Sequence, residues 1–391
     1  MPERTIPQMF EESVKRFPKN TLIMEKTTDT YQSYTYKQIH ERVRAFAAGL
    51  KTLGLAKGDR TALIAEGRKD WVVAELGVLY CGAINVPVSV KIDESADLKF
   101  RIAHSGCKMV IISAGQRGKI TAIKNDLPDL EKIILLDRVP DIGPDEVYID
   151  NVIQSGSAYL EKHAAEFDAA WKSISEKDYA NICYTSGTTA DPKGIILTHR
   201  NYTANVEQSS HLLPIPEYYL SLLILPWDHA FAHTAGIYTL MKNGATMASV
   251  QVGKTPLETL KNIPVNIKES KPVFLLSVPS LAKSFRKNIE KGIKEKGEKV
   301  EKLFNSALEL AYDYNGLGYD RGRGLKKLKY PLYKLYDKLI FSKIRANFGG
   351  RLEFFIGGGA LLDIELQRFF YAIGIPMFQG YGLTEAAPVI S

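Results

Sequence analysis

Cysteine is scarce in this chain, which has only three among 391 residues. Cys81, Cys107 and Cys183 are widely spaced, odd in number and lack the spacing of metal ligands. A disulfide framework and a cysteine-based metal centre are therefore excluded as organising features. This cysteine usage favours a reducing compartment, and we expect a cytoplasmic protein.

Long apolar runs are also missing. The best of them, Leu220–Leu225, falls far short of the ~20 residues that a membrane-spanning helix needs. The residues after Met1 lead directly into an amphipathic pattern, without the features of a signal peptide. Hydrophobic residues at 45% and charged residues at 24% are ordinary for a soluble globular protein, and the length suits two or three domains.

Acidic residues are fewer than basic ones, and the formal net charge is +7. The excess is local, because residues 283–345 contain 17 Lys and Arg but only 8 Asp and Glu. Such a segment suits phosphates, an acidic carrier protein or a membrane surface, and a solvated helix face is an equally good interpretation. Its tyrosines are Tyr312, Tyr314, Tyr319, Tyr330, Tyr333 and Tyr336. Without a recognised nucleic-acid-binding module, we interpret them as core-packing residues of a helical insertion.

Strands and helices alternate along most of the chain. The predicted strands are 60–65, 83–88, 108–113, 132–136, 219–225, 245–250, 273–277, 351–356 and 376–379. Helices are expected between them, and the pattern loosens from 140 to 175 around a polar helix at 158–170. This alternation predicts an α/β fold with two doubly wound subdomains packed together, at 1–175 and 176–391, and a helical insertion at 283–345.

The stretch 184–194 combines small hydroxyl residues, glycines and one lysine behind an apolar run. Strand character before and after it predicts a hairpin-like loop between two strands. Glycine lets the backbone approach a ligand, and consecutive N–H groups can bind an anion, to which Lys193 would add a mobile positive charge. A nucleotide P-loop would instead place Ser or Thr after the lysine and open a helix. The alternative is a solvated turn without a ligand.

Two further clusters follow strands near the end of the chain. Gly357–Ala360 is a glycine-rich turn, for which tight strand-to-helix packing is an equally good explanation. In the stretch 380–385, Tyr381 offers an aromatic face, and Thr384 and Glu385 pair a hydroxyl with a carboxylate. A phosphate contact beside a magnesium ligand is the chemistry that this pair suits.

The chain resembles the AMP-forming acyl-adenylate superfamily, which includes acyl-CoA ligases, luciferases and nonribosomal adenylation domains. Three motifs carry the resemblance in the family's order: the loop at 185–194, Pro226-Trp227-Asp228-His229, and Gly380-Tyr381-Gly382-Leu383-Thr384-Glu385. The match extends over essentially the whole chain. The stretch 341–361 and the helical insertion before it are similar to long-chain fatty acid CoA ligases in particular.

The resemblance implies a role for each matching residue. ATP phosphates would be held by Thr185, Ser186, Gly187, Thr188, Thr189 and Lys193, and the adenine and acyl entrance would be bordered by Gly358, Gly359 and Ala360. Tyr381, next to Gly382, would stack on adenine, Thr384 would contact the α-phosphate, and Glu385 would ligate Mg²⁺. His229 matches the family's histidine near the acyl carboxylate, and a hydrogen-bonded core histidine is the alternative. A zinc pair of His229 and His233 is disfavoured, because Ala230 stands where a metalloprotease needs glutamate.

The implied reaction joins a fatty acid and ATP into an acyl adenylate and then transfers the acyl group to CoA. The alternatives are an enzyme that loads an acyl carrier protein and a non-catalytic acyl-binding module. We expect no nucleic-acid partner; the resemblance allows a homodimer, and residues 312–338 suggest peripheral membrane contact.

The chain also departs from the family pattern. Ala190 replaces a glycine of the loop, and the chain stops at Ser391 without the family's barrel subdomain and mobile C-terminal domain. We therefore expect an N-terminal portion that is poorly active alone.

Overall fold

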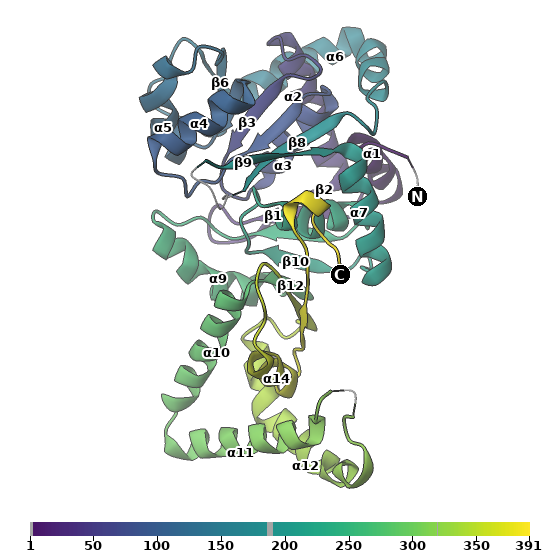
Figure 1. Cartoon of the computed structure of the whole chain (residues 1–391), viewed down its shortest axis with the longest axis vertical. Helices are drawn as coiled ribbons and strands as arrows, with labels where there is room; N and C mark the ends of the chain where they lie inside the picture. Colours follow the sequence, from purple (N-terminus) through teal and green to yellow (C-terminus); the bar gives the residue numbers. More distant parts are fainter. Residues whose placement is uncertain (1–2, 186–190, 319) are drawn as a thin grey trace. The chain divides into compact units, whose positions relative to one another are not determined.

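The computed structural model describes residues 3–185, 191–318 and 320–391 (Figure 1). Its contacts divide the chain into two compact units. Unit 1 comprises Met1–Tyr218, Pro226–Ser249 and Leu383–Val389, and unit 2 comprises Tyr219–Leu225, Val250–Gly382 and Ile390–Ser391. The α/β architecture with parallel sheets that the strand–helix alternation predicts is confirmed. The boundary predicted after residue 175 stays a prediction.

Unit 1 contains a sheet with the strand order β7-β6-β5-β3-β4-β8-β9. Its strands are β3 (Arg60–Ile64), β4 (Ile84–Pro87), β5 (Cys107–Ile112), β6 (Lys132–Leu135), β7 (Glu146–Tyr148), β8 (Tyr179–Thr185) and β9 (Lys193–Thr198). Neighbouring strands are parallel from β7 through β8, and β8 pairs with β9 in antiparallel fashion. Two of the central strands contain continuous aliphatic runs, Val110-Ile111-Ile112 in β5 and Ile133-Ile134-Leu135 in β6, as expected for a sheet covered on both faces.

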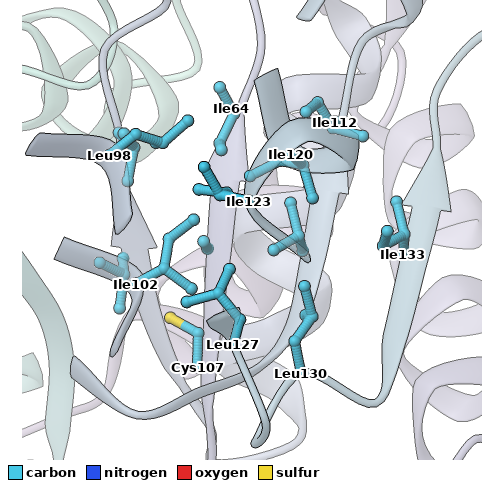
Figure 2. Close-up of a cluster of buried hydrophobic side chains, with 14 of the residues drawn as sticks. Ile64, Leu98, Ile102, Cys107, Ile112, Ile120, Ile123, Leu127, Leu130 and Ile133 are labelled. Atoms are coloured by element: carbon cyan, nitrogen blue, oxygen red, sulfur yellow. The ribbon is translucent and has the colours of Figure 1, made fainter. Parts of the chain in front are cut away.

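A cluster of aliphatic side chains packs between this sheet and two of its helices (Figure 2). Leu98 and Ile102 come from α4 (Ser95–Ser105), and Ile120 and Ile123 come from α5 (Arg117–Ile123). They pack with Ile64, Val110, Ile112 and Ile133 of β3, β5 and β6. Burial of each such side chain contributes about 1.5–3 kcal/mol, so this cluster holds the central strands in place.

The remaining α-helices of unit 1 are α1 (Ile6–Arg16), α2 (Tyr36–Thr52), α3 (Lys69–Tyr80), α6 (Ile149–Lys172), α7 (His199–Leu212) and α8 (Thr239–Lys242). Unit 1 also contains the short turns η1 (Ala114–Gln116), η2 (Lys124–Asp126) and η6 (Thr384–Ala386) and the π-helix η3 (Ala232–Tyr238). Strands β11 (Thr246–Ser249), β1 (Thr21–Glu25) and β2 (Gln32–Thr35) lie side by side in that order. β1 is parallel to β11 and antiparallel to β2.

Helix α6 begins nine residues before the helix that the sequence predicts at 158–170. The Ser-Gly-Ser stretch around Gly156, expected to be loop-like, lies inside this helix. A Cβ atom on Gly156 would lie 1.8 Å from the carbonyl oxygen of Ala45, and one on Gly49 would lie 2.0 Å from that of Val152. The two glycines therefore let the backbones of α2 and α6 touch, which local propensity does not reveal.

Unit 2 contains the strand order β14-β13-β12-β10, and all its neighbouring pairs are parallel. The strands are β10 (Leu220–Leu223), β12 (Phe274–Ser277), β13 (Phe354–Gly357) and β14 (Met377–Gln379), and the helices α9 (Pro256–Ser270), α10 (Pro279–Lys294) and α14 (Ile364–Ala372) accompany them. This agrees with the second strand–helix alternation that the sequence predicts.

The predicted helical insertion is also present in unit 2. It continues from α10 through α11 (Glu298–Asn315), η4 (Gly324–Lys329), α12 (Tyr330–Tyr336), η5 (Asp337–Phe341) and α13 (Ser342–Ala346). Within unit 2, α11 and α12 lie at the end away from β10 and β12 (Figure 1). No helix in the described part of the chain combines the length and apolar character that crossing a bilayer requires.

Candidate functional site

The predicted phosphate loop connects two strands that pair as a hairpin. Thr185, at the end of β8, pairs with Lys193, at the start of β9, and Tyr184 pairs with Gly194. The hairpin predicted from the polar run between two apolar segments is therefore confirmed. Ser186, Gly187, Thr188 and Thr189 lie outside the described residues, as does Ala190. Of the residues expected to hold phosphates, Thr185 is half-buried and Lys193 is exposed, and both lie where the two strands meet the loop.

Tyr184, the last aromatic residue before the loop, contacts two side chains of helix α4. The Tyr184 hydroxyl lies 2.8 Å from His104 Nδ1, and the Arg101 guanidinium lies 5.4 Å from the centre of the Tyr184 ring. Burial raises the pKa of Tyr184 to about 12, so its hydroxyl stays neutral at physiological pH. A Cβ atom on Gly194 would meet this ring at 3.4 Å, an ordinary van der Waals distance, and would meet the Ile182 side chain more tightly, at 3.1 Å.

A group of buried polar side chains centred on the carboxylate of Glu75 supports strand β8. We call it the Glu75 cluster, and its members are Glu75, Asn85, Asn181, Tyr202, His233 and Tyr238. All six side chains are buried. Glu75 accepts hydrogen bonds from Asn85 Nδ2, from the Tyr238 hydroxyl and from Asn181 Nδ2 at 3.2 Å. Asn181 Nδ2 also lies 3.1 Å from the Tyr202 hydroxyl. A buried carboxylate needs several donors to offset its lost hydration, and here it has three.

The Glu75 cluster joins elements that are distant in sequence. Asn85 of β4 and Asn181 of β8 are partners in the sheet, and Tyr238 ends the π-helix η3 (Ala232–Tyr238). His233, in the same π-helix, lies 3.4 Å through Nε2 from Glu75 Oε1, and its ring lies 5.0 Å from that of Trp71. The cluster therefore ties the strand that leads into the phosphate loop to the segment that follows His229.

The buried side chain of Trp227 anchors the segment that precedes the π-helix η3. Trp227 is buried against Trp71, with their ring centres 5.6 Å apart. A Cβ atom on Gly67 would lie 2.4 Å from the Trp227 indole, so the indole contacts the main chain directly. Burial raises the pKa of the next residue, Asp228, above its ordinary value.

His229 is presented outward at the end of this segment. Its Nδ1 accepts a hydrogen bond from the backbone N–H of Phe231 at 3.3 Å, which assigns the proton of the neutral ring to Nε2. The residue as a whole is exposed, and protein atoms near the ring remove part of its hydration. This desolvation lowers the pKa of His229, an effect that Asp228 opposes and His233 reinforces. His229 is therefore a neutral N–H donor at physiological pH, whereas His233, four residues on, is the buried member of the pair.

Thr384 and Glu385 lie in a tight turn, η6 (Thr384–Ala386), which belongs to unit 1. The Ala387 N–H bonds to the Thr384 carbonyl at 3.1 Å, and Ala387 has a positive φ of 70°. η6 lies against β9, the strand that begins at Lys193. The structure thus brings the elements that carry Lys193, Thr384 and Glu385 together in one unit.

Two side chains of unit 1 anchor this C-terminal segment. Asn205 of α7 donates from Nδ2 to the Val389 carbonyl at 2.7 Å and accepts from the Val389 N–H at 3.0 Å. The Thr234 hydroxyl of the π-helix donates to the Ala387 carbonyl at 2.9 Å. Sequence reasoning did not single out Asn205 or Thr234, because nothing local marks a side chain that binds a distant backbone.

The exposed carboxylate of Glu385 fits the expected magnesium ion. Mg²⁺ in proteins is commonly held by one or two carboxylates together with substrate phosphates. A single acidic side chain in a turn that lies against β9, at the end of the predicted phosphate loop, matches that donor set.

In unit 2 the glycine turn is organised by Gln379. Its Oε1 accepts from the Leu362 N–H at 2.6 Å, and its Nε2 donates to the Gly380 carbonyl at 2.7 Å and the Ala360 carbonyl at 3.3 Å. The Gly380 N–H also bonds to the Gly357 carbonyl at 2.7 Å. The predicted residues Gly358, Gly359 and Ala360 are therefore gathered beside the stretch that contains Tyr381 and Gly382. Gly359 requires glycine, since its φ is +81°.

Tyr381 presents an exposed ring beside that turn. Its backbone N–H bonds to the Ser391 carbonyl at 2.8 Å, and its carbonyl accepts from the Ile390 N–H at 3.0 Å. An exposed aromatic face held by backbone pairing and adjacent to glycines can stack on a planar base.

None of the three cysteines is an activated nucleophile. Cys81, Cys107 and Cys183 are all unpaired, and burial raises the pKa of each thiol to about 12.

Comparison with known proteins adds a family and several relatives. A family model described as AMP-binding enzyme matches residues 10–391. Long chain acyl-CoA synthetase 8 of Arabidopsis thaliana is 28% identical over 97% of this chain and 55% of its own length. A chloroplastic long-chain fatty acid–acyl-carrier-protein ligase from the same plant is 26% identical over 99% of this chain and 56% of its own length.

Among solved structures, an anthranilate CoA ligase in complex with anthranoyl-AMP matches all of this chain and 62% of its own with a TM-score of 0.73 at 17% identity. This likeness supports the fold. The chain spans about half the length of these two curated relatives.

Proposed function

Because the chain belongs to the AMP-binding enzyme family, we propose that it carries the acyl-adenylate-forming site of a long-chain fatty acid CoA ligase. The observation that carries this proposal is the packing of η6, with Thr384 and Glu385, against the strand that begins at Lys193. A hydroxyl, a carboxylate and an ammonium group thereby lie on adjoining elements, as binding and activation of a nucleotide phosphate require.

The first step of the proposed reaction forms an acyl adenylate. An oxygen of the fatty carboxylate attacks the α-phosphorus of ATP, a new P–O bond forms, and the bond to the bridging oxygen breaks to release pyrophosphate. Negative charge grows on the phosphoryl oxygens and on the leaving group. Lys193 and the hydroxyl of Thr384 are the groups that would stabilise this charge.

Glu385 would hold Mg²⁺, which supplies further neutralisation of phosphate charge when it is bound. Tyr381 would stack on the adenine, with the turn at Gly358, Gly359 and Ala360 against the same ring. His229 would donate its Nε2 proton to the fatty carboxylate in a hydrogen bond. Because its pKa is lowered, it would orient that group as a neutral donor.

In the second step the thiol of CoA attacks the acyl carbon, a thioester forms and AMP leaves. The acceptor thiol comes from the substrate, since the chain's own thiols stay protonated at physiological pH. The same unpaired cysteines support our proposal of a reducing, cytoplasmic location.

A second candidate function shares the first step but transfers the acyl group to an acyl carrier protein. It is favoured by the 26% identity to a plant ligase with that acceptor. The basic excess of residues 283–345 would attract such an acidic protein.

Acid-dependent exchange of pyrophosphate into ATP tests the shared step in the full-length protein. We expect exchange with long-chain fatty acids and its loss, by about tenfold or more, in Lys193→Ala, because a charge-assisted phosphate contact disappears. No exchange with any acid in a panel of chain lengths would refute adenylation. Supplying CoA or acyl carrier protein to the preformed adenylate then decides between the two acceptors.

A further inference from the structure

The helical insertion of unit 2 displays a row of leucines that the core does not use. Leucines follow one another at alternating spacings of three and four residues through η4, α12 and η5. They are Leu325, Leu328, Leu332, Leu335 and Leu339, which we call the leucine stripe. Between 44% and 83% of each residue's surface is exposed. Side chains at this spacing lie on one face of a helical segment.

The segment that carries the stripe has two apolar faces. One of them is buried in unit 2, and the leucine stripe is the other. The core-facing residues are Tyr333, Ile340, Phe341 and Ile344, and all of them are buried. The exposed leucines are therefore not needed to hold the segment against unit 2. Five large exposed apolar side chains in one row form a contiguous surface feature of the kind that marks an interaction site.

The segment that carries the stripe is rigidly held. The Tyr333 ring stacks on Tyr314 of α11 at 4.9 Å, and the Arg321 guanidinium lies 5.4 Å from the Tyr333 ring centre. Arg345 forms two hydrogen bonds to Asp337, at 2.6 and 3.0 Å, and donates to the Ile373 carbonyl at 2.8 Å. The stripe is thus presented on a preformed platform.

Lysines accompany the stripe. Residues 326–338 include five lysines and one acidic residue, Asp337, which pairs with Arg345. Lys326 lies 3.8 Å from Asp320, and Lys329 pairs with Asp313. The remaining three, Lys327, Lys334 and Lys338, are exposed. Exposed leucines bordered by lysines are typical of a segment that lies on an anionic lipid surface.

We propose that the leucine stripe and its lysines dock this protein on the surface of an anionic membrane. The leucines enter the boundary between headgroups and acyl chains, and the lysines meet the lipid phosphates. Leu325 and Leu328 are the most exposed of the five, and such protruding side chains suit a fluid apolar phase that needs no matching pocket.

Self-association through the stripe is less favourable on the same observations. The repeat covers only about two heptads, fewer than a stable coiled coil uses. Lys329 and Lys338 border the leucines, so two copies paired along the stripe would bring lysines close to lysines.

Vesicle sedimentation without ATP or fatty acid tests the proposal independently of catalysis. We expect the 391-residue chain to bind vesicles of phosphatidylcholine mixed with phosphatidylglycerol, more weakly in high salt, and to bind pure phosphatidylcholine far less. Neutralising Lys327, Lys334 and Lys338 to Gln should weaken binding about a hundredfold, since each lysine near such a surface contributes roughly fivefold. Leu325→Ser with Leu328→Ser should weaken it about tenfold or more.

Matched controls separate this surface from general charge and apolarity. Lys287→Gln, Lys294→Gln and Lys299→Gln remove the same charge from exposed positions on α10 and α11. Leu257→Ser with Leu260→Ser removes an exposed pair of the same spacing on α9. Unchanged thermal unfolding would verify that each variant is folded, and both controls should retain binding.

Three results would overturn the proposal. The first is equal loss of vesicle binding in the stripe variants and their controls. The second is a dimer that dissociates on Leu325→Ser with Leu328→Ser while wild-type protein ignores vesicles. The third is binding of an acidic acyl carrier protein through the stripe in the absence of any vesicle binding.

Discussion

Lys193 and Tyr381 have separate proposed roles in nucleotide binding. Lys193, exposed at the start of β9, would meet phosphates, and Tyr381, an exposed ring beside a glycine turn, would meet adenine. Lys193→Ala should weaken ATP binding about tenfold and AMP binding much less, whereas Tyr381→Ala should weaken both about equally. Titration calorimetry with the two nucleotides measures this difference. Equal losses of ATP and AMP affinity in Lys193→Ala would contradict the assignment.

The structural role of Glu75 can also be tested by a single substitution. Gln in its place would turn an amide N–H₂ toward groups that already donate, either Asn85 or Tyr238 with Asn181. We expect Glu75→Gln to lower the free energy of unfolding by about 3 kcal/mol, because a buried donor loses its acceptor. Urea denaturation measures the change. Glu41→Gln, on the exposed face of α2, is the control and should change stability little.

At the scale of elements, the contact between α2 and α6 depends on two glycines. Gly156→Ala would place its Cβ atom 1.8 Å from the Ala45 carbonyl, so the two helices would have to separate. We expect a loss of about 3 kcal/mol in stability and a lower Tm. Gly118→Ala is the matched control, since it lies in α5 with no atom within 4 Å of the added Cβ. Equal Tm values for the two variants would argue against a direct contact of the helix backbones.

Elements with a local signature were predictable from the sequence. The β8–β9 hairpin follows from a polar, glycine-containing run between two apolar strands, and α3 follows from its apolar content and its place between two predicted strands. Glu75 was detectable in principle, because a carboxylate within the otherwise apolar stretch Trp71–Tyr80 must be buried with partners.

Other elements depend on tertiary contacts. The start of α6 was missed because Ser155, Gly156 and Ser157 are weak helix formers, and the contact of Gly156 with α2 overrides that preference. The π-helix at 232–238 has no sequence signature in the usual helical period. Asn205, which anchors Val389, is separated from it by 184 residues, and no local pattern identifies such a pair.

At the scale of the whole molecule, a buried histidine, His199, makes the stability of the fold depend on pH. Burial lowers the pKa of His199 to about 4, and its Nδ1 accepts from the Ile6 N–H at 3.4 Å. The folded pKa lies below the unfolded value near 6.5, so this contribution to stability is fully present above pH 6.5 and is lost as the pH falls toward 4. Going from pH 7 to pH 5 should cost about 2 kcal/mol from this residue.

His199→Asn retains an acceptor near the position of Nδ1 and cannot titrate in this range. Urea denaturation at pH 7 and pH 5 should therefore show a smaller pH-dependent loss in the variant than in the wild type. The same loss in both proteins would assign the pH dependence to other groups.

Strand β9 ends the strand order of its sheet, so part of its backbone is open to pairing with another chain. The strand reads Lys-Gly-Ile-Ile-Leu-Thr, and Lys193 is its only charged residue. Three features guard it against aggregation: its shortness, the charge of Lys193, and the packing of η6 against it. Lys193 therefore also protects the protein from aggregation, in addition to its proposed catalytic role. A substitution that removes its charge would also remove this protection against intermolecular strand pairing.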